Sequence, residues 1–161
     1  MFKRRPRPQP PLARTDAEWQ ARLAPEAYRV LRRSGTEAPG SSPHVHPPAE
    51  ADGVYRCAGC DAELFRAEDQ FDSGTGWPSF SDSASRDAVL VRTDFKLLFP
   101  RREATCAQCG GHLGHVFGDG PVPTGQRWCI NGAALMLDDA SADPRCVKTL
   151  RPQPASRRTQ Q

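Results

Sequence analysis

The chain has 161 residues, 37% of them hydrophobic and 16 of them proline, and this length favours one domain with loose ends over two domains sharing a small core. No stretch approaches the roughly 18 apolar residues of a membrane span, and the basic start runs into prolines instead of an apolar signal core, so a membrane-spanning protein and a secreted precursor are both disfavoured. The net charge of +3 arises at the ends, because residues 15–144 hold only 12 of the 22 basic residues and all 19 acidic ones, which disfavours a nucleic-acid-binding domain.

Both ends of the chain are predicted to be disordered. Residues 1–14 and 141–161 are basic, rich in proline and too poor in apolar area to offset the entropy of an ordered chain. The folded domain is therefore predicted to extend over residues 15–140.

The domain is predicted to begin with two short helices. Thr15-Asp16-Ala17-Glu18 fits a capping box, which marks a helix start. Pro25 can occupy the first turn of a second helix, with Tyr28 and Leu31 on one face and Gly35 placed to end it. Residues 39–48, which include four prolines, are predicted to form a linker.

From Gly53 onward the pattern changes to short β-prone runs separated by glycines, which predicts a small antiparallel β domain. The predicted strands contain Val54-Tyr55-Arg56, Val89-Leu90-Val91, Phe95-Lys96-Leu97-Leu98-Phe99, Val116-Phe117, Trp128-Cys129-Ile130 and Leu135-Met136-Leu137.

Four of the six cysteines form two C-x-x-C pairs, Cys57 with Cys60 and Cys106 with Cys109. Two such turns can bring four thiolates onto one tetrahedral Zn²⁺, which leaves no place for water or substrate, so a single structural zinc is predicted. A dithiol redox motif or two disulfides are the alternatives, but a thioredoxin-like motif needs a βαβ context that this pattern lacks.

Cys129 stands apart from these pairs. Strand alternation puts Arg127, Cys129 and Asn131 on one face, where a guanidinium would raise the reactive thiolate fraction. A buried core cysteine is the alternative. Upstream, His112 and His115 lie among glycines, which is unusual in a core, although they could also belong to a second metal site. A reactive thiol with a titratable imidazole predicts thiol chemistry, and these residues alone do not choose between hydrolysis and redox.

Taken in order, these motifs resemble the B-type methionine-R-sulfoxide reductases, which repair one epimer of oxidised methionine. The resemblance covers about residues 15–137 and leaves both tails outside. It is carried by Val54-Tyr55-Arg56-Cys57-Ala58-Gly59-Cys60, Phe71-Asp72-Ser73-Gly74-Thr75-Gly76-Trp77-Pro78-Ser79-Phe80, Cys106 to Cys109, Gly111-His112-Leu113-Gly114-His115-Val116-Phe117 and Arg127-Trp128-Cys129-Ile130-Asn131-Gly132.

The resemblance implies an α+β fold that is mainly β, in which short N-terminal helices precede the twisted antiparallel sheets of a β-tent pinned by the four-cysteine zinc. It also implies thiol-dependent reduction of methionine-R-sulfoxide in peptides and proteins, with Cys129 attacking the sulfoxide sulfur and ending as a sulfenic acid. The resemblance further implies that His115 acts as the acid, with His112 beside it, and that Asp119 orients His115. Asn131 would help to set the geometry of the site. The substrate would be bound by Trp77, Arg127 and Phe117.

One position departs from the family pattern. Many members carry a resolving cysteine between the two glycines of the Gly-x-Gly-Trp-Pro stretch, where this chain has Thr75. The sulfenic acid is therefore expected to react with thioredoxin or another external thiol, and Cys146 is the alternative resolving thiol. A zinc-ribbon module that binds RNA or protein without catalysis is the rival function, and a thiol hydrolase is another. A cytoplasmic monomer is expected.

Overall fold

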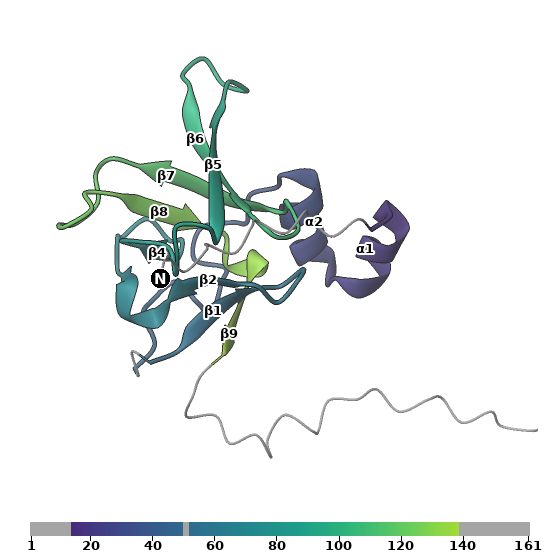
Figure 1. The fold of residues 1–161 in the computed structure, drawn as a ribbon, viewed down its shortest axis with the longest axis horizontal. Coiled ribbons are helices and arrows are strands. Elements are labelled where there is room, and N and C mark those ends of the chain that lie inside the picture. Colours follow the sequence, from purple (N-terminus) through teal and green to yellow (C-terminus); the bar gives the residue numbers. More distant parts are fainter. Residues whose placement is uncertain (1–13, 50–51, 139–161) are drawn as a thin grey trace, which may run out of the picture.

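The computed structural model describes residues 14–49 and 52–138, and Figure 1 shows two small helices beside two twisted antiparallel sheets. The predicted basic tails lie almost wholly outside the described residues. None of the helices in the described ranges is long and apolar enough to cross a membrane.

Helix α1 (Asp16–Arg22) begins at the predicted capping box. The backbone amide of Thr15 donates to the Glu18 carboxylate at 2.7 Å, and the amide of Glu18 donates to the Thr15 hydroxyl at 3.2 Å. Two amides that a helix start leaves without partners are thus satisfied, typically worth about 1 kcal/mol for the cap.

Helix α2 (Pro25–Arg33) begins with Pro25 in its first turn, as predicted, but Gly35 does not supply the left-handed residue that ends it. Ser34 takes that conformation, with φ 52°, and the amide of Gly35 donates to the carbonyl of Arg29 at 3.0 Å. Leu31 is buried, and Tyr28 is half-buried with its hydroxyl donating to the Asp16 carboxylate of α1 at 2.8 Å.

The strands form two antiparallel sheets, which confirms the predicted fold class. The smaller sheet has β1 (Val54–Cys57) between β2 (Glu63–Arg66) and β9 (Leu135–Asp138). The larger sheet has the order β3-β4-β8-β7-β6-β5, with bounds β3 (Gln70–Phe71), β4 (Ser79–Phe80), β5 (Val89–Asp94), β6 (Arg101–Cys106), β7 (His112–Phe117) and β8 (Arg127–Ile130). Residues 39–48 contain neither helix nor strand, as the linker prediction requires.

An aromatic cluster joins the two sheets. Tyr55 of β1 and Phe65 of β2 contact Phe80 of β4, with ring centroids 5.1 and 4.5 Å apart, and Phe65 also contacts Trp128 of β8 at 5.9 Å. Each such pair typically adds about 0.5–1.5 kcal/mol beyond its buried area. Because Trp128 is held in this core, its neighbour Cys129 faces the opposite side of β8.

The predicted strand over residues 95–99 is wrong. These residues form the turn that joins β5 to β6, in a hairpin that extends beyond the rest of the sheet in Figure 1. The side chain of Asp94 accepts the amide of Lys96 at 2.9 Å, a local turn contact that competes with strand pairing. An apolar run forms a strand only where its side chains find a surface to pack on, and here they find none among the described residues.

Candidate active site and metal cluster

Strand register brings Cys129 and His115 together. They are direct partners in the antiparallel pairing of β8 with β7, where opposite Cβ atoms lie about 4.5–5.5 Å apart. Trp128 and Ile130 are buried, whereas Cys129 and Arg127 are half-buried, which confirms the predicted alternation.

Gly114 explains why a glycine stands between the two histidines. A Cβ at this position would overlap the carbonyl oxygen of Cys129 on the neighbouring strand. Only glycine lets β7 approach β8 this closely.

The Cys129 thiol opens into a cavity of about 160 Å³ at this junction. Two aromatic rings, of Trp77 and Phe117, supply apolar walls, and the amide of Asn131 and the imidazole of His115 supply polar ones. The cavity is lined by Thr36, Trp77, Arg101, Gly114, His115, Phe117, Cys129, Ile130 and Asn131. Five of the eight predicted catalytic or substrate-binding residues therefore line it, whereas His112, Asp119 and Arg127 do not.

Trp77 reaches the cavity from a tight turn. Gly74 and Gly76 adopt left-handed φ values of 71° and 88°, which other residues rarely adopt. The Trp77 indole N–H donates to the carbonyl of Glu37 at 3.1 Å, so the ring plane is fixed from outside its own turn.

Glu37 is a buried residue whose role the sequence did not reveal. Its carboxylate accepts the amides of Gly132 at 2.6 Å and Ala133 at 2.9 Å, and its own amide donates to the side-chain oxygen of Asn131 at 3.0 Å. The Asn131 amide nitrogen in turn donates to the carbonyl of Leu113 at 2.9 Å. Asn131 is thereby held rigidly beside Cys129.

His115 is paired with a carboxylate, but not with the expected one. Its Nε2 lies 3.4 Å from Oδ2 of Asp94, the last residue of β5, and Arg101 Nη2 lies 3.2 Å from the same oxygen. Asp119, predicted to orient His115, is instead bound to Arg127. Burial lowers the pKa of His115, Asp94 works in the opposite direction, and Arg101 lowers it further, so the imidazole is mainly neutral at pH 7.

His112 lies behind the cavity. It is buried, its Nδ1 lies 2.7 Å from the Glu103 carboxylate, and its ring centroid is 5.5 Å from that of His115 in an edge-on arrangement. His112 thus supports the His115 ring and does not face the cavity.

Arg127 forms a two-point ion pair with Asp119, at 2.9 and 3.1 Å, and stands 4.5 Å over the Phe117 ring. The guanidinium is therefore fixed next to Cys129. Asp119 is well exposed, so the pair itself adds little stability.

The pKa of Cys129 is raised above its ordinary value, because burial outweighs the lowering effects of the Arg127 guanidinium and of the nearby Thr75 hydroxyl. The sequence led us to expect a thiolate favoured by Arg127. Arg127 acts in that direction, but the resting group is a thiol, so its proton must be removed for it to react.

Four other sulfurs gather at one point elsewhere in the fold. Those of Cys57, Cys60, Cys106 and Cys109 all lie within 4.8 Å of one another, with pairs at 3.7 and 3.5 Å. Zn²⁺ binds thiolates at about 2.3 Å, which places the sulfurs of a tetrahedron about 3.8 Å apart, so the cluster fits the ion. All four cysteines are buried, and four thiolates would fill every position of the tetrahedron, which leaves none open for chemistry.

The N-terminal helices pack on this cluster. A Cβ on Gly111 would lie 2.8 Å from Leu31, so this glycine makes room for a helix side chain, and Gly59 lies within ordinary contact distance of Trp19 and Leu31. Arg32 of α2 donates to the carbonyl of Cys109 at 3.0 Å. The cluster thereby ties α1 and α2 to both sheets.

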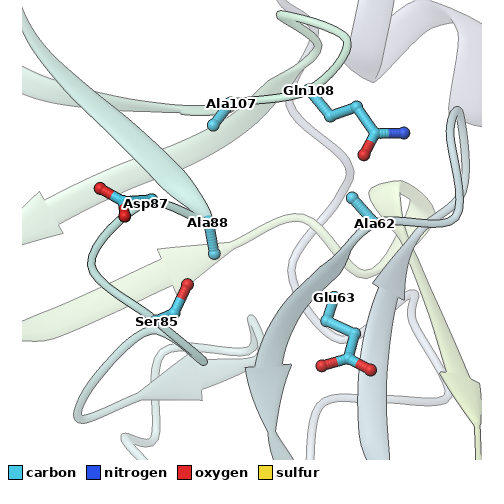
Figure 2. A pocket seen from close by; sticks show the side chains of 7 residues that line it. All are labelled: Ala62, Glu63, Ser85, Asp87, Ala88, Ala107 and Gln108. Carbon is cyan, nitrogen blue, oxygen red and sulfur yellow. The ribbon is translucent and has the colours of Figure 1, made fainter. Parts of the chain in front are cut away.

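A hollow of about 260 Å³ beside the second cysteine turn is larger than the cavity at Cys129. Figure 2 shows the carboxylates of Glu63 and Asp87 pointing away from each other at its rim. It contains no thiol, imidazole or aromatic ring, and we assign it no chemistry. Cys146, the alternative resolving thiol, lies outside the described residues.

A half-buried thiol paired with an imidazole in an aromatic-walled cavity, with a separate four-sulfur cluster as a staple, defines a site for cysteine-dependent enzyme chemistry. The family model of the SelR domain matches residues 23–139. The chain is 52% identical over 122 residues to peptide methionine sulfoxide reductase MsrB of Thiobacillus denitrificans, covering 76% of this chain and 91% of that protein.

Two further relatives give the same result. MsrB of Agrobacterium fabrum is 45% identical over 129 residues, covering 80% of this chain and 94% of the relative. The mitochondrial methionine-R-sulfoxide reductase B2 of Rattus norvegicus is 47% identical over 131 residues, covering 77% and 74%. The chain therefore belongs to the methionine sulfoxide reductase B family.

Proposed function

We propose that the protein reduces methionine-R-sulfoxide in peptides and proteins to methionine, with Cys129 as the nucleophile. The observation that carries this proposal is the register pair of Cys129 and His115 at the cavity walled by Trp77. The family membership supports the reaction class and the residue pair supports the mechanism.

The Cys129 thiol and the His115 imidazole are both neutral at rest, so the thiol holds a proton that the imidazole can accept. His115 accepts the thiol proton as the Cys129 sulfur attacks the sulfoxide sulfur, and then delivers it to the sulfoxide oxygen, which leaves poorly unless protonated. The oxygen ends on Cys129 as a sulfenic acid and methionine departs. Cys129 loses two electrons, and the substrate sulfur gains them.

The cavity walls position the substrate. The S-methyl group rests on the apolar face of Trp77, with Phe117 on the other side. Asn131 is held beside Cys129 by its hydrogen bonds with Glu37 and Leu113, and Asp119 fixes the Arg127 guanidinium next to the Cys129 thiol.

The reduced enzyme is regenerated by an external thiol. With Thr75 at the position where many family members have a cysteine, thioredoxin or another thiol attacks the sulfenic acid, forms a mixed disulfide and releases the oxygen as water, and a second thiol then resolves the disulfide. Cys146 is the alternative resolving group, and a crosslink to Cys129 in stoichiometrically oxidised protein would identify it.

The four-cysteine cluster holds one structural Zn²⁺ in this proposal, within a domain of residues 15–140. The protein acts as a monomer in this proposal. None of the five described cysteines forms a disulfide, which suits a reducing compartment such as the cytoplasm.

The proposal is tested with dabsylated methionine-R-sulfoxide and dithiothreitol as reductant. Wild type reduces the R epimer, and Cys129→Ser does not, although it retains zinc and the same circular dichroism spectrum. Equal rates for the two proteins would contradict the assignment.

A further inference from the structure

The turn between β5 and β6 carries four exposed large apolar side chains, those of Phe95, Leu97, Leu98 and Phe99, which we call the apolar tip. Their exposed fractions are 75%, 59%, 98% and 78%. Single exposed apolar residues are common, but a cluster of this kind on a projecting hairpin marks an interaction surface.

The hairpin that carries the apolar tip also contributes residues to the surroundings of the Cys129 cavity. Asp94 and Arg101 are register partners at the base of the turn, and they flank the apolar tip in the chain. Asp94 contacts His115, and Arg101 lines the cavity. The base of the hairpin that carries the apolar tip therefore borders the cavity that receives the oxidised methionine.

The chemistry of the substrate favours an apolar contact here. Methionine side chains mostly belong to apolar cores, and oxidation to the polar sulfoxide disrupts such cores. The chain on either side of an oxidised methionine in a destabilised protein is therefore rich in apolar residues and exposed.

The hairpin also suits an extended chain. β5 is an edge strand of the larger sheet, so its outer backbone groups are free to pair with an added strand, and Leu90 and Val91 are partly exposed along it. Residues 89–106 hold four basic and two acidic residues, which favours a segment that also carries acidic groups.

We propose that the apolar tip docks an unfolded, apolar segment of the oxidised protein next to its methionine sulfoxide. This proposal rests on the reductase activity proposed above and adds a preference for unfolded apolar substrates. The tip contributes contact area outside the cavity, so it acts on the polypeptide and not on the sulfoxide itself.

The experiment compares kcat/KM for two substrates, N-acetyl-methionine-R-sulfoxide amide and a synthetic peptide in which leucine and phenylalanine flank methionine-R-sulfoxide. In the variant L98S/F99S we expect kcat/KM for the peptide to fall about tenfold, because two apolar side chains that the bound peptide partly buries are removed. The value of kcat/KM for the small substrate should not change. Met136→Ser, on β9 of the smaller sheet, removes another exposed apolar side chain and serves as the matched control.

Three outcomes would overturn the proposal. An equal loss for both substrates would show that the variant disturbs the cavity. Unchanged peptide kinetics with a loss of binding to vesicles of phosphatidylcholine and phosphatidylglycerol would assign the tip to a lipid surface. Unchanged peptide kinetics with a lower sedimentation mass would assign it to a second copy of this chain.

Failure of the reductase activity itself has a different signature. A wild-type protein that reduces neither substrate overturns the proposed function, and the docking proposal with it, before any variant is compared.

Discussion

The carboxylate of Asp94 and the imidazole of His115 meet across the larger sheet, with Oδ2 3.4 Å from Nε2. Asp94 ends β5, so this contact links the hairpin that bears the apolar tip to the strand that bears the imidazole. Asp94 is 7% exposed and is held by Arg101 and by the amide of Lys96, which fixes its direction.

Asp94→Asn is expected to lower kcat by about tenfold or more, since His115 loses the group that stabilises its protonated form during proton transfer. Asp94 raises the pKa of His115, so its removal lowers that pKa. His115 must be neutral to accept the thiol proton, and the acid limb of the rate profile should therefore move to lower pH.

The pH dependence of kcat and the NMR titration of His115 measure this shift. Glu63→Gln, which removes an exposed carboxylate paired with Arg56, is the control and should leave both unchanged. An acid limb that stays in place in Asp94→Asn would exclude the proposed role of His115 as the proton acceptor.

The resting thiol of Cys129 gives a second prediction. Because its pKa is raised by burial and lowered in part by Arg127, Arg127→Met should raise it further. The rate of iodoacetamide modification of the peptide that contains Cys129, followed by mass spectrometry, should then rise with pH at a higher midpoint than in wild type. A midpoint that moves down would show that Arg127 does not face the thiol.

Thr75 gives a third prediction, because its side chain lies close enough to Cys129 to lower the pKa of the thiol. Thr75→Cys is expected to form a disulfide with Cys129 after one turnover, seen as the loss of two titratable thiols and a crosslinked peptide. Ser85→Cys, placed at the hollow of Figure 2, should form no such crosslink. An uncrosslinked sulfenic acid in Thr75→Cys would contradict the assigned proximity.

The cysteine cluster gives a fourth prediction. Structural zinc contributes about 10–16 kcal/mol in small zinc peptides, as much as the whole stability of a typical domain, so removal of zinc should unfold this one. Cys106→Ser or strong chelation should lower the melting temperature sharply and abolish the circular dichroism spectrum of the fold. Cys129→Ser should keep one zinc per chain, and an unchanged melting curve after chelation would refute the structural role.

The sequence was informative where chemistry follows from spacing. Two C-x-x-C turns predict the metal cluster, and alternation on one strand predicts the face of Cys129. The sequence was uninformative where residues distant in the chain meet. Strand register places Asp94, and not Asp119, beside His115. This register depends on the β5–β6 hairpin, whose turn was predicted as a strand.

Glu37 shows the same limit. It precedes a linker and has no local pattern, yet it binds residues 132 and 133 and orients Trp77 and Asn131. A buried carboxylate of this kind is recognised only when the backbone amides that it satisfies are brought to it by the fold.

Gly114 gives the last prediction, because at this residue β7 lies in close contact with β8, the neighbouring strand of the cavity. Gly114→Ala puts a methyl group onto the carbonyl oxygen of Cys129, and neither backbone can yield without breaking the β7–β8 pairing. We expect a loss of about 1–3 kcal/mol in the free energy of unfolding and a larger loss of kcat/KM, since the thiol and the imidazole are moved apart. Gly118→Ala, just beyond the end of β7, meets no atom within 4 Å and is the matched control. Chemical denaturation and steady-state kinetics of the two variants separate these effects, and full activity in Gly114→Ala would show that the register pair is not what brings Cys129 and His115 into reach.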